Sequence, residues 1–335
     1  MTQLQITAFG DPSVLRLNPS LDKVPAEGEV RVRICFAGVN PIDAKTRAGL
    51  GWAAAQNKDK LPWTPGYDVS GVVEKVGPHV ATLVEGDAVC GMVGFPLTAG
   101  GYAESVVVRE DELVRLDGVS LKQGAALPLA GLTAWQGLFE HGALKGGQRV
   151  LILAGAGGVG HLAVQFASAY GAEVVTTASR DNHSFLHGLG ASQMVDYNDA
   201  DWVAQVVAGG QVDLVLDLMG GESGKAALAC VKPGGRLVTV PTITAQQIKE
   251  AGAEAGIEVL GMLVHPDQRQ LTQVLMLLRQ GDVHITLSGE FPLAEGALAH
   301  GAIEGGHVRG KLLLRMPAAD GQPGEHEAQR GDSQR

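Results

Sequence analysis

The stretch VLILAGAGGVGHLAVQFASAYGAEVV, residues 150–175, constrains the fold of this chain more than any other. An apolar run leads into the glycine pattern G-x-G-x-x-G, and a helix-like segment and a second apolar run, 173–177, follow. In this strand–turn–helix–strand setting the pattern predicts a dinucleotide site, because backbone N–H groups at the helix start can face a pyrophosphate. The alternative is a structural glycine turn in an α/β protein that binds no dinucleotide. The expected cofactor-binding residues of the turn are Gly155, Gly157, Gly158, Val159 and Gly160.

The end of the second apolar run decides between NADH and NADPH. An NAD site has an acid at this point, whereas here Ala178 stands there, with Ser179 and Arg180 directly behind it. An arginine can pair with a 2′-phosphate through two hydrogen bonds, so NADPH is the expected cofactor. Asp181 is the rival acid, but it comes three positions late and fits better as a cap or first-turn acid of the next helix.

From about residue 149 onward, apolar runs alternate with helical stretches. Several of the runs are almost continuously hydrophobic, as strands buried on both faces are. Repeated βα units of this length predict a doubly wound parallel sheet and an α/β fold. The six runs are RVLIL, AEVVTT, QMVDY, VDLVLDL, GRLVTV and IEVLGM.

The part of the chain before this region has a different pattern. Residues 28–115 alternate with period two between glycine turns, which predicts a small β-rich domain, and residues 51–63 are expected to interrupt it as a loop. Later, 268–281 has the pattern of an amphipathic helix, and GKLLLRM, 310–316, is expected to be a late strand that rejoins the first domain.

Composition excludes several classes of function. The formal charge of −10 and the lack of a long Lys/Arg run disfavour nucleic acid and acidic membrane surfaces as partners. Three widely spaced cysteines give neither a disulfide framework nor a zinc-ligand pattern. The N-terminal residues do not resemble a signal peptide, and no apolar run is long enough to span a bilayer, so a cytoplasmic location is expected.

Asn40 stands in AGVNPID, where a strand-like run ends and a helix is expected to begin. A capping residue, a proline at the first helical position and Asp43 in the first turn are typical of a helix start. Asn40 can serve only as this cap, or it can also take part in a reaction. The local spacing leaves both interpretations open.

The chain resembles the zinc-free quinone oxidoreductase (zeta-crystallin-like) group of the medium-chain dehydrogenase/reductase superfamily. The resemblance implies a GroES-like β-rich domain from 1–123 and 265–316, a Rossmann NADPH-binding domain from 124–264, and a polar tail, 317–335. It also implies an active site between the domains and a homodimer or homotetramer. The motifs that carry the resemblance are NPIDAKTRAG, PGYDVSGVVEKVG, GDAVCG, GGYAE, LPLAGLTAWQGL, AGAGGVG and GGHVRGKLLL.

The same resemblance implies that the protein holds no metal. Zinc-dependent members of the superfamily have a cysteine at the position of Asn40 and a His-Glu pair at Tyr67 and Asp68, and an amide, a phenol and one carboxylate are poor zinc ligands. By motif position, Asn40, Tyr67 and Thr133 are the implied catalytic residues. Three further positions are implied to contact the cofactor, namely Arg180, Tyr197 and Lys311.

Together these points predict an NADPH-dependent reductase that passes a hydride to a quinone or an α,β-unsaturated carbonyl without zinc. The substrate would be a small molecule. The protein would supply orientation and hydrogen bonds, while the cofactor carries the chemistry. Two alternatives stay open. One is an NADPH-binding protein with a structural or sensing role and little turnover, and the other is a zinc-free enzyme of the alcohol dehydrogenase type.

Overall fold

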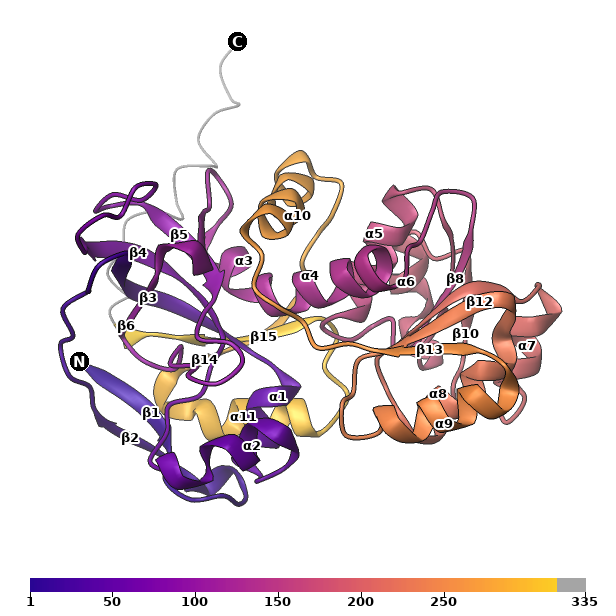
Figure 1. The fold of residues 1–335 in the computed structure, drawn as a ribbon, viewed down its shortest axis with the longest axis horizontal. Coiled ribbons are helices and arrows are strands. Elements are labelled where there is room, and N and C mark those ends of the chain that lie inside the picture. Colours follow the sequence, from indigo (N-terminus) through magenta and orange to yellow (C-terminus); the bar gives the residue numbers. More distant parts are fainter. Residues whose placement is uncertain (318–335) are drawn as a thin grey trace, which may run out of the picture.

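The computed structural model describes residues 1–317 and contains two large sheets that lie side by side in Figure 1. The first of these two is a six-stranded parallel sheet, which confirms the predicted doubly wound α/β architecture. Each predicted apolar run forms one of its strands. In spatial order the strands are β10 (Gln193–Val195), β9 (Glu173–Thr177), β8 (Arg149–Ile152), β11 (Val212–Asp217), β12 (Val231–Thr239) and β13 (Glu258–Gly261).

Helices cover both faces of this sheet because successive strand residues point to opposite sides. Val150 and Ile152 pack in one apolar cluster with α5 (Gly160–Ala169) and α6 (His183–Gly188). Leu151 belongs to a second cluster on the other face. That cluster includes residues of α7 (Trp202–Ala208), α8 (Gly221–Ala227) and α9 (Ala245–Ala255).

The second large sheet has seven strands and contains the predicted β-rich region together with two late strands. Its strands run in the order β14-β15-β3-β4-β5-β7, with β6 also paired to β3. The expected late strand therefore lies between β14 and β3, although the domain limits 1–123, 124–264 and 265–316 stay a prediction. The bounds are β3 (Glu29–Val39), β4 (Asp68–Val76), β5 (Ala88–Met92), β6 (Ser105–Arg109), β7 (Leu113–Arg115), β14 (Leu287–Pro292) and β15 (Lys311–Arg315). A separate antiparallel pair comprises β1 (Thr2–Ile6) and β2 (Leu15–Pro19).

Helices α4 and α10 lie between the two sheets in Figure 1. The predicted helix at 268–281 is confirmed as α10 (Gln268–Gln280), and α4 (Pro128–Trp135) continues into a π-helical turn, Gln136–His141. The remaining helices flank the seven-stranded sheet and the β1–β2 pair. They are α1 (Pro41–Arg47), α2 (Gly51–Asn57), α3 (Leu121–Ala126) and α11 (Gly296–Glu304).

The loop predicted for residues 51–63 was wrong, because its first half is helix α2. Gly51 begins the helix, and three consecutive alanines with strong helix propensity follow Trp52. Ala53 and Ala54 are buried, so tertiary packing supports a segment that lacks a long apolar period.

The expected polar tail, 317–335, lies outside the described residues apart from position 317. Within residues 1–317, no helix combines the length and the apolar character needed to cross a membrane.

Candidate active site

The glycine turn follows β8 at the point where the strand order reverses, between β9 and β11. Gly155 and Gly160 have no room for a side chain. A Cβ on Gly155 would lie 2.0 Å from Thr176 Oγ1, and one on Gly160 would lie 2.1 Å from the carbonyl oxygen of Ala154. These two glycines therefore allow the close packing of strand, turn and helix.

Gly157 differs from these two glycines because the space beside it is open. A Cβ there would meet only the Ala154 oxygen, at 3.4 Å, and Gly157 also lines a pocket between the turn and the loop before β15. The turn is thus closed toward the protein and open toward this pocket, which is the shape that a pyrophosphate needs in order to approach the backbone. The residues fit the predicted dinucleotide.

A second pocket of about 190 Å³ lies where residues of both large sheets' domains meet. It is lined by Asn40 at the end of β3, by Thr133 in α4 and by Val159 of the glycine turn. The structure therefore brings two of the three predicted catalytic residues together with the predicted cofactor turn. Tyr67 does not line this pocket.

The side chain of Asn40 is held at both ends. Its Nδ2 donates to Asp68 Oδ2 at 2.9 Å, and its Oδ1 accepts a hydrogen bond from Lys311 Nζ. Because a lysine can only donate and a carboxylate accepts, these partners fix which end of the amide faces which way. The second N–H of the amide has no acceptor within residues 1–317, and Asn40 is one of the residues that line the pocket.

Lys311 and Asp68 form a buried ion pair behind this amide. Lys311 Nζ lies 3.6 Å from Asp68 Oδ2, and Asp68 Oδ1 accepts from the backbone N–H of Leu129 at 2.7 Å. Burial raises the pKa of Asp68 and lowers the pKa of Lys311, and each charge opposes the change in the other. The Lys311 stem also packs beside the glycine turn, since a Cβ on Gly158 would lie 3.2 Å from Lys311 Cδ.

Sequence reasoning placed Lys311 near the cofactor, and the structure directs its ammonium elsewhere. The ammonium is turned to Asn40 and Asp68, and Lys311 lines neither of the two pockets described above. Its contact with the cofactor stays a prediction, while its contact with Asn40 is a role that sequence reasoning missed.

Asp43 is a second buried carboxylate next to this ion pair. It accepts from the backbone N–H groups of Asn40 at 2.9 Å and Gly66 at 3.2 Å, and Tyr102 donates to it at 3.4 Å. Burial raises the pKa of Asp43 to about 7, the charge of Asp68 adds to the rise, and the backbone hydrogen bonds oppose it. As predicted for a helix start, Asp43 holds the first turn of α1.

Tyr67 and Thr133 both bond back to the protein. The hydroxyl of the buried Tyr67 donates to the carbonyl oxygen of Pro96 at 3.1 Å, and its ring packs edge-on against Phe95 with ring centroids 5.0 Å apart. A catalytic role for Tyr67 stays a prediction, and this placement argues against it. Thr133 Oγ1 donates to Leu129 O at 2.7 Å, so the hydroxyl that lines the pocket can act toward a ligand as an acceptor.

The residues expected near a 2′-phosphate do not all line the pocket beside the glycine turn. Ser179 and Tyr197 line the same pocket as Gly157. Arg180 is not among the lining residues, and its guanidinium lies 3.5 Å from Asp199 and 3.8 Å from Asp196.

Arg309, in the loop before β15, lines that pocket and was missed by sequence reasoning. Its Nε donates to Asn182 Oδ1 at 2.7 Å, and its guanidinium lies 5.0 Å from the centre of the Phe185 ring. The next residue, Gly310, donates its N–H to Ala156 O in the glycine turn at 2.9 Å. Arg309 is part of the motif GGHVRGKLLL, so the sequence contained a signal for it. The position of this motif beside the glycine turn depends on tertiary structure.

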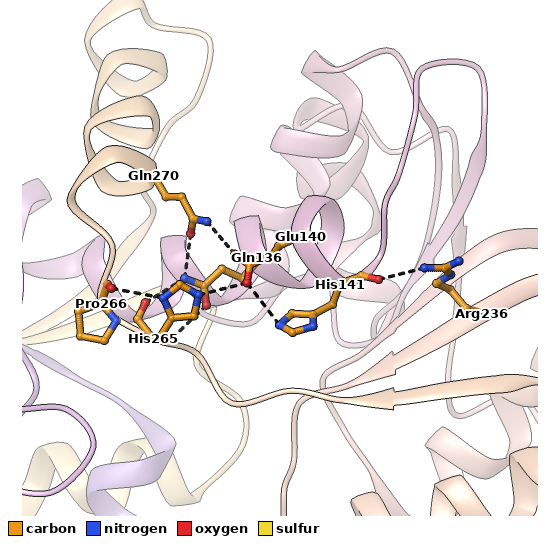
Figure 2. A network of polar contacts seen from close by, with 7 residues as sticks. All are labelled: Gln136, Glu140, His141, Arg236, His265, Pro266 and Gln270. Atoms are coloured by element: carbon orange, nitrogen blue, oxygen red, sulfur yellow. Dashed lines mark hydrogen bonds and ion pairs between the residues drawn. The ribbon is translucent and has the colours of Figure 1, made fainter.

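The buried side chain of Gln136 lies at the centre of a polar network beside the segment 262–265 (Figure 2). The Gln136 amide donates to His265 O at 2.9 Å and accepts from His265 N at 3.0 Å, and it also donates to Gln270 at 2.8 Å. Glu140 bonds to both His265 and Gln270 around it. Residues 262–264, which immediately precede His265, line the pocket, so this network ties that wall to the π-helical turn after α4.

Comparisons with known proteins agree with this architecture. Residues 26–118 match the alcohol dehydrogenase GroES-like domain, and residues 189–314 match the zinc-binding dehydrogenase family. A quinone oxidoreductase of Pseudomonas aeruginosa is 33% identical over 93% of this chain and 98% of its own length.

Two solved structures are also similar to this chain. The quinone oxidoreductase from Coxiella burnetii has a TM-score of 0.91 and 40% identity, covering 94% of this chain and 99% of its own. The Escherichia coli quinone oxidoreductase complexed with NADPH has a TM-score of 0.82 and 25% identity, covering 94% of this chain and 100% of its own.

The fold and the glycine-turn site define a two-domain NAD(P)-dependent oxidoreductase. The chain belongs to the quinone oxidoreductase group of the medium-chain dehydrogenase/reductase superfamily.

Proposed function

We propose that the protein is an NADPH-dependent, zinc-independent reductase of quinones or α,β-unsaturated carbonyls. The observation that carries the proposal is the placement of the Asn40 amide and Val159 of the glycine turn on the wall of one mostly apolar pocket. When bound, the nicotinamide would supply the hydride. The free N–H of Asn40 can donate to the substrate oxygen as negative charge develops on it, and the apolar lining excludes water from that hydrogen bond.

The same cluster supports zinc independence. At the positions where zinc-dependent members of the superfamily have their ligands, Asn40 and Asp68 both contact the ammonium of Lys311, while the Tyr67 hydroxyl bonds to Pro96. A positive charge is therefore already present beside these two side chains, and it would repel a divalent cation. Within residues 1–317, no three His, Cys, Asp or Glu side chains are grouped so that they could hold a metal ion.

An acceptor panel tests the activity. The oxidation of NADPH, followed by its absorbance, is expected to proceed with a 1,4-quinone or with a 2-alkenal and without added zinc. NADPH binding with no turnover on either acceptor would favour the structural or sensing alternative. Zinc-stimulated oxidation of a primary alcohol, with neither acceptor reduced, would favour the alcohol dehydrogenase alternative.

For the choice of cofactor, we propose that Ser179, Tyr197 and Arg309 surround the 2′-phosphate, with Arg180 at the rim. Arg309→Gln is expected to weaken NADPH binding roughly tenfold or more, because a charge-assisted hydrogen bond is lost. Arg180→Gln is expected to weaken it less than about fivefold, because the exposed Arg180 already pairs with two acids.

Calorimetric titration of each arginine variant with NADPH and with NADH checks these expectations, since NADH lacks the phosphate. Neither substitution should change the affinity for NADH. Equal losses for both nucleotides would overturn the assignment of the phosphate site, and a larger effect at Arg180 than at Arg309 would reverse the two roles.

Assembly and location complete the proposal. We propose the homodimer or homotetramer that the family resemblance implies, which light scattering of the purified protein measures. We also propose the cytoplasmic location expected from the sequence.

A further inference from the structure

Among the described residues, one charged side chain lines the interdomain pocket. Its wall is built from apolar side chains of both domains, including Ile42, Trp52, Phe95, Ile243 and Leu263. Of the lining residues within 1–317, Lys45 is the only charged one, and none is acidic. An apolar pocket with one uncompensated cation favours a ligand that is itself apolar with one negative group.

Lys45 has no counterion in the described chain. It is exposed in the last turn of α1 and forms no ion pair or side-chain hydrogen bond within residues 1–317. The other charged groups of α1 are engaged, since Arg47 pairs with Glu304 and the Asp43 carboxylate is buried among hydrogen-bond donors. The helix dipole favours a cation in this turn, but it does not explain why that cation lies on the pocket wall.

Asn40 and Lys45 mark two different parts of the same pocket. Asn40 occupies the N-cap position of α1 and is almost fully buried, whereas Lys45 lies near the end of that helix and is exposed. A ligand between them would meet a neutral amide N–H at its buried end and an ammonium at its solvent end. A carbonyl suits the first group and an oxyanion suits the second.

We propose that the preferred acceptors carry an oxyanion group, such as a carboxylate, sulfonate or phosphate, on an apolar body, and that Lys45 selects them. The carbonyl oxygen of the acceptor faces Asn40 while the anion pairs with Lys45 at the solvent end of the pocket. This inference names the substrate class of the proposed reductase and therefore rests on that function.

The kinetic test compares 1,2-naphthoquinone with 1,2-naphthoquinone-4-sulfonate as acceptors for the full chain and for Lys45→Gln. The two quinones differ in reactivity, so the informative quantity is the ratio of their kcat/KM values in the variant relative to the wild type. We expect the sulfonate to lose about twofold to fivefold relative to the neutral quinone, more in Lys45→Glu, and less at high salt. An unchanged ratio in both variants would overturn the proposal.

Lys58→Gln is the matched control. Lys58 is an exposed lysine just after α2 and does not line the pocket, so its removal changes the net charge equally without touching the site. We expect it to leave the ratio of the two quinones unchanged. An equal effect of Lys58→Gln and Lys45→Gln would show that the ratio depends on the net charge of the protein, and it would contradict selection by Lys45. A loss of NADPH affinity in Lys45→Gln, with the ratio unchanged, would assign Lys45 to the cofactor and also overturn the proposal.

A binding measurement separates this inference from the proposed activity. The protein is titrated calorimetrically with 2-naphthoate in the absence of NADPH. We expect the dissociation constant to rise about twofold to fivefold in Lys45→Gln, because an exposed ion pair between Lys45 and the carboxylate is lost. It should not change in Lys58→Gln. If no quinone or alkenal is reduced but this dependence on Lys45 is found, the reductase proposal fails and the anion preference stands. If quinones are reduced but Lys45 affects neither measurement, the reductase proposal stands and the anion preference fails.

Discussion

Replacing Gly157 by valine is expected to abolish cofactor binding while the protein stays folded. The new Cβ would lie 3.4 Å from its nearest neighbour, an ordinary contact distance, and the backbone at this position is not in the left-handed region. The added Cβ therefore fits beside the turn, and we expect the two methyl groups of valine to occupy the space where a pyrophosphate must approach the turn. Calorimetric titration with NADPH should show no measurable binding, and the thermal midpoint should stay close to that of the wild type.

Gly160→Ala is the control, because it adds a smaller side chain to the same motif. Its Cβ would lie 2.1 Å from the Ala154 oxygen and 2.7 Å from Gly155 Cα, so the turn itself must move. We expect a loss of about 1–3 kcal/mol or more in the free energy of unfolding, as overpacking costs. Normal NADPH binding by a folded Gly157→Val protein would contradict the use of this turn for the cofactor.

Lys311→Met is expected to lower the free energy of unfolding by about 3–5 kcal/mol, because it leaves a buried carboxylate without its cation. The methionine keeps most of the stem that packs near Gly158, so the change is mainly one of charge. Adding Asp68→Asn should restore much of the loss, since an asparagine needs no cation. Urea unfolding of the two single variants and the double variant measures the coupling between the residues.

The pH dependence of Lys311→Met provides a second check. Burial already raises the pKa of Asp68, and losing the attraction of Lys311 raises it further. When folding raises the pKa of a carboxyl, that carboxyl does not destabilise the protein at a pH low enough to protonate it in both the folded and the unfolded state. Its destabilisation of the folded state grows as the pH rises from the unfolded-state pKa toward the folded-state pKa. The stability difference between variant and wild type should therefore shrink at acid pH. A variant as stable as the wild type across the range would refute the ion pair.

The parts of this fold that could be predicted from the sequence are those with local signals. Each strand of the parallel sheet contains an apolar run, and the glycine turn contains strand, turn and helix signals within one segment. The first half of the segment 51–63 was wrongly predicted as loop because its alanines give propensity without an apolar period, and only the packing of Ala53 and Ala54 shows where they belong.

The contacts of the candidate site depend on residues far apart in the chain. The bond between Lys311 and Asn40 joins residues 271 positions apart, and Arg309 bonds Asn182 across 127 positions. No periodicity or spacing links such partners, because both contacts depend on how β15 and the loop before it lie against the rest of the molecule. The sequence thus indicated that Asn40 and Lys311 matter, but not that they contact each other.

The position of β15 has a consequence for the order in which the protein is made. Because β15 pairs with β3 and supplies Lys311, a ribosome completes every strand of the parallel sheet, β8 to β13, before it adds the strand that completes the other sheet. During synthesis the nucleotide-binding unit can fold first, whereas the contact between Asn40 and Lys311 cannot form until almost the end of the described chain has been made. A nascent chain that stops before residue 311 lacks both the strand and the ammonium, so the contact between Lys311 and Asn40 forms only in chains that have passed this point.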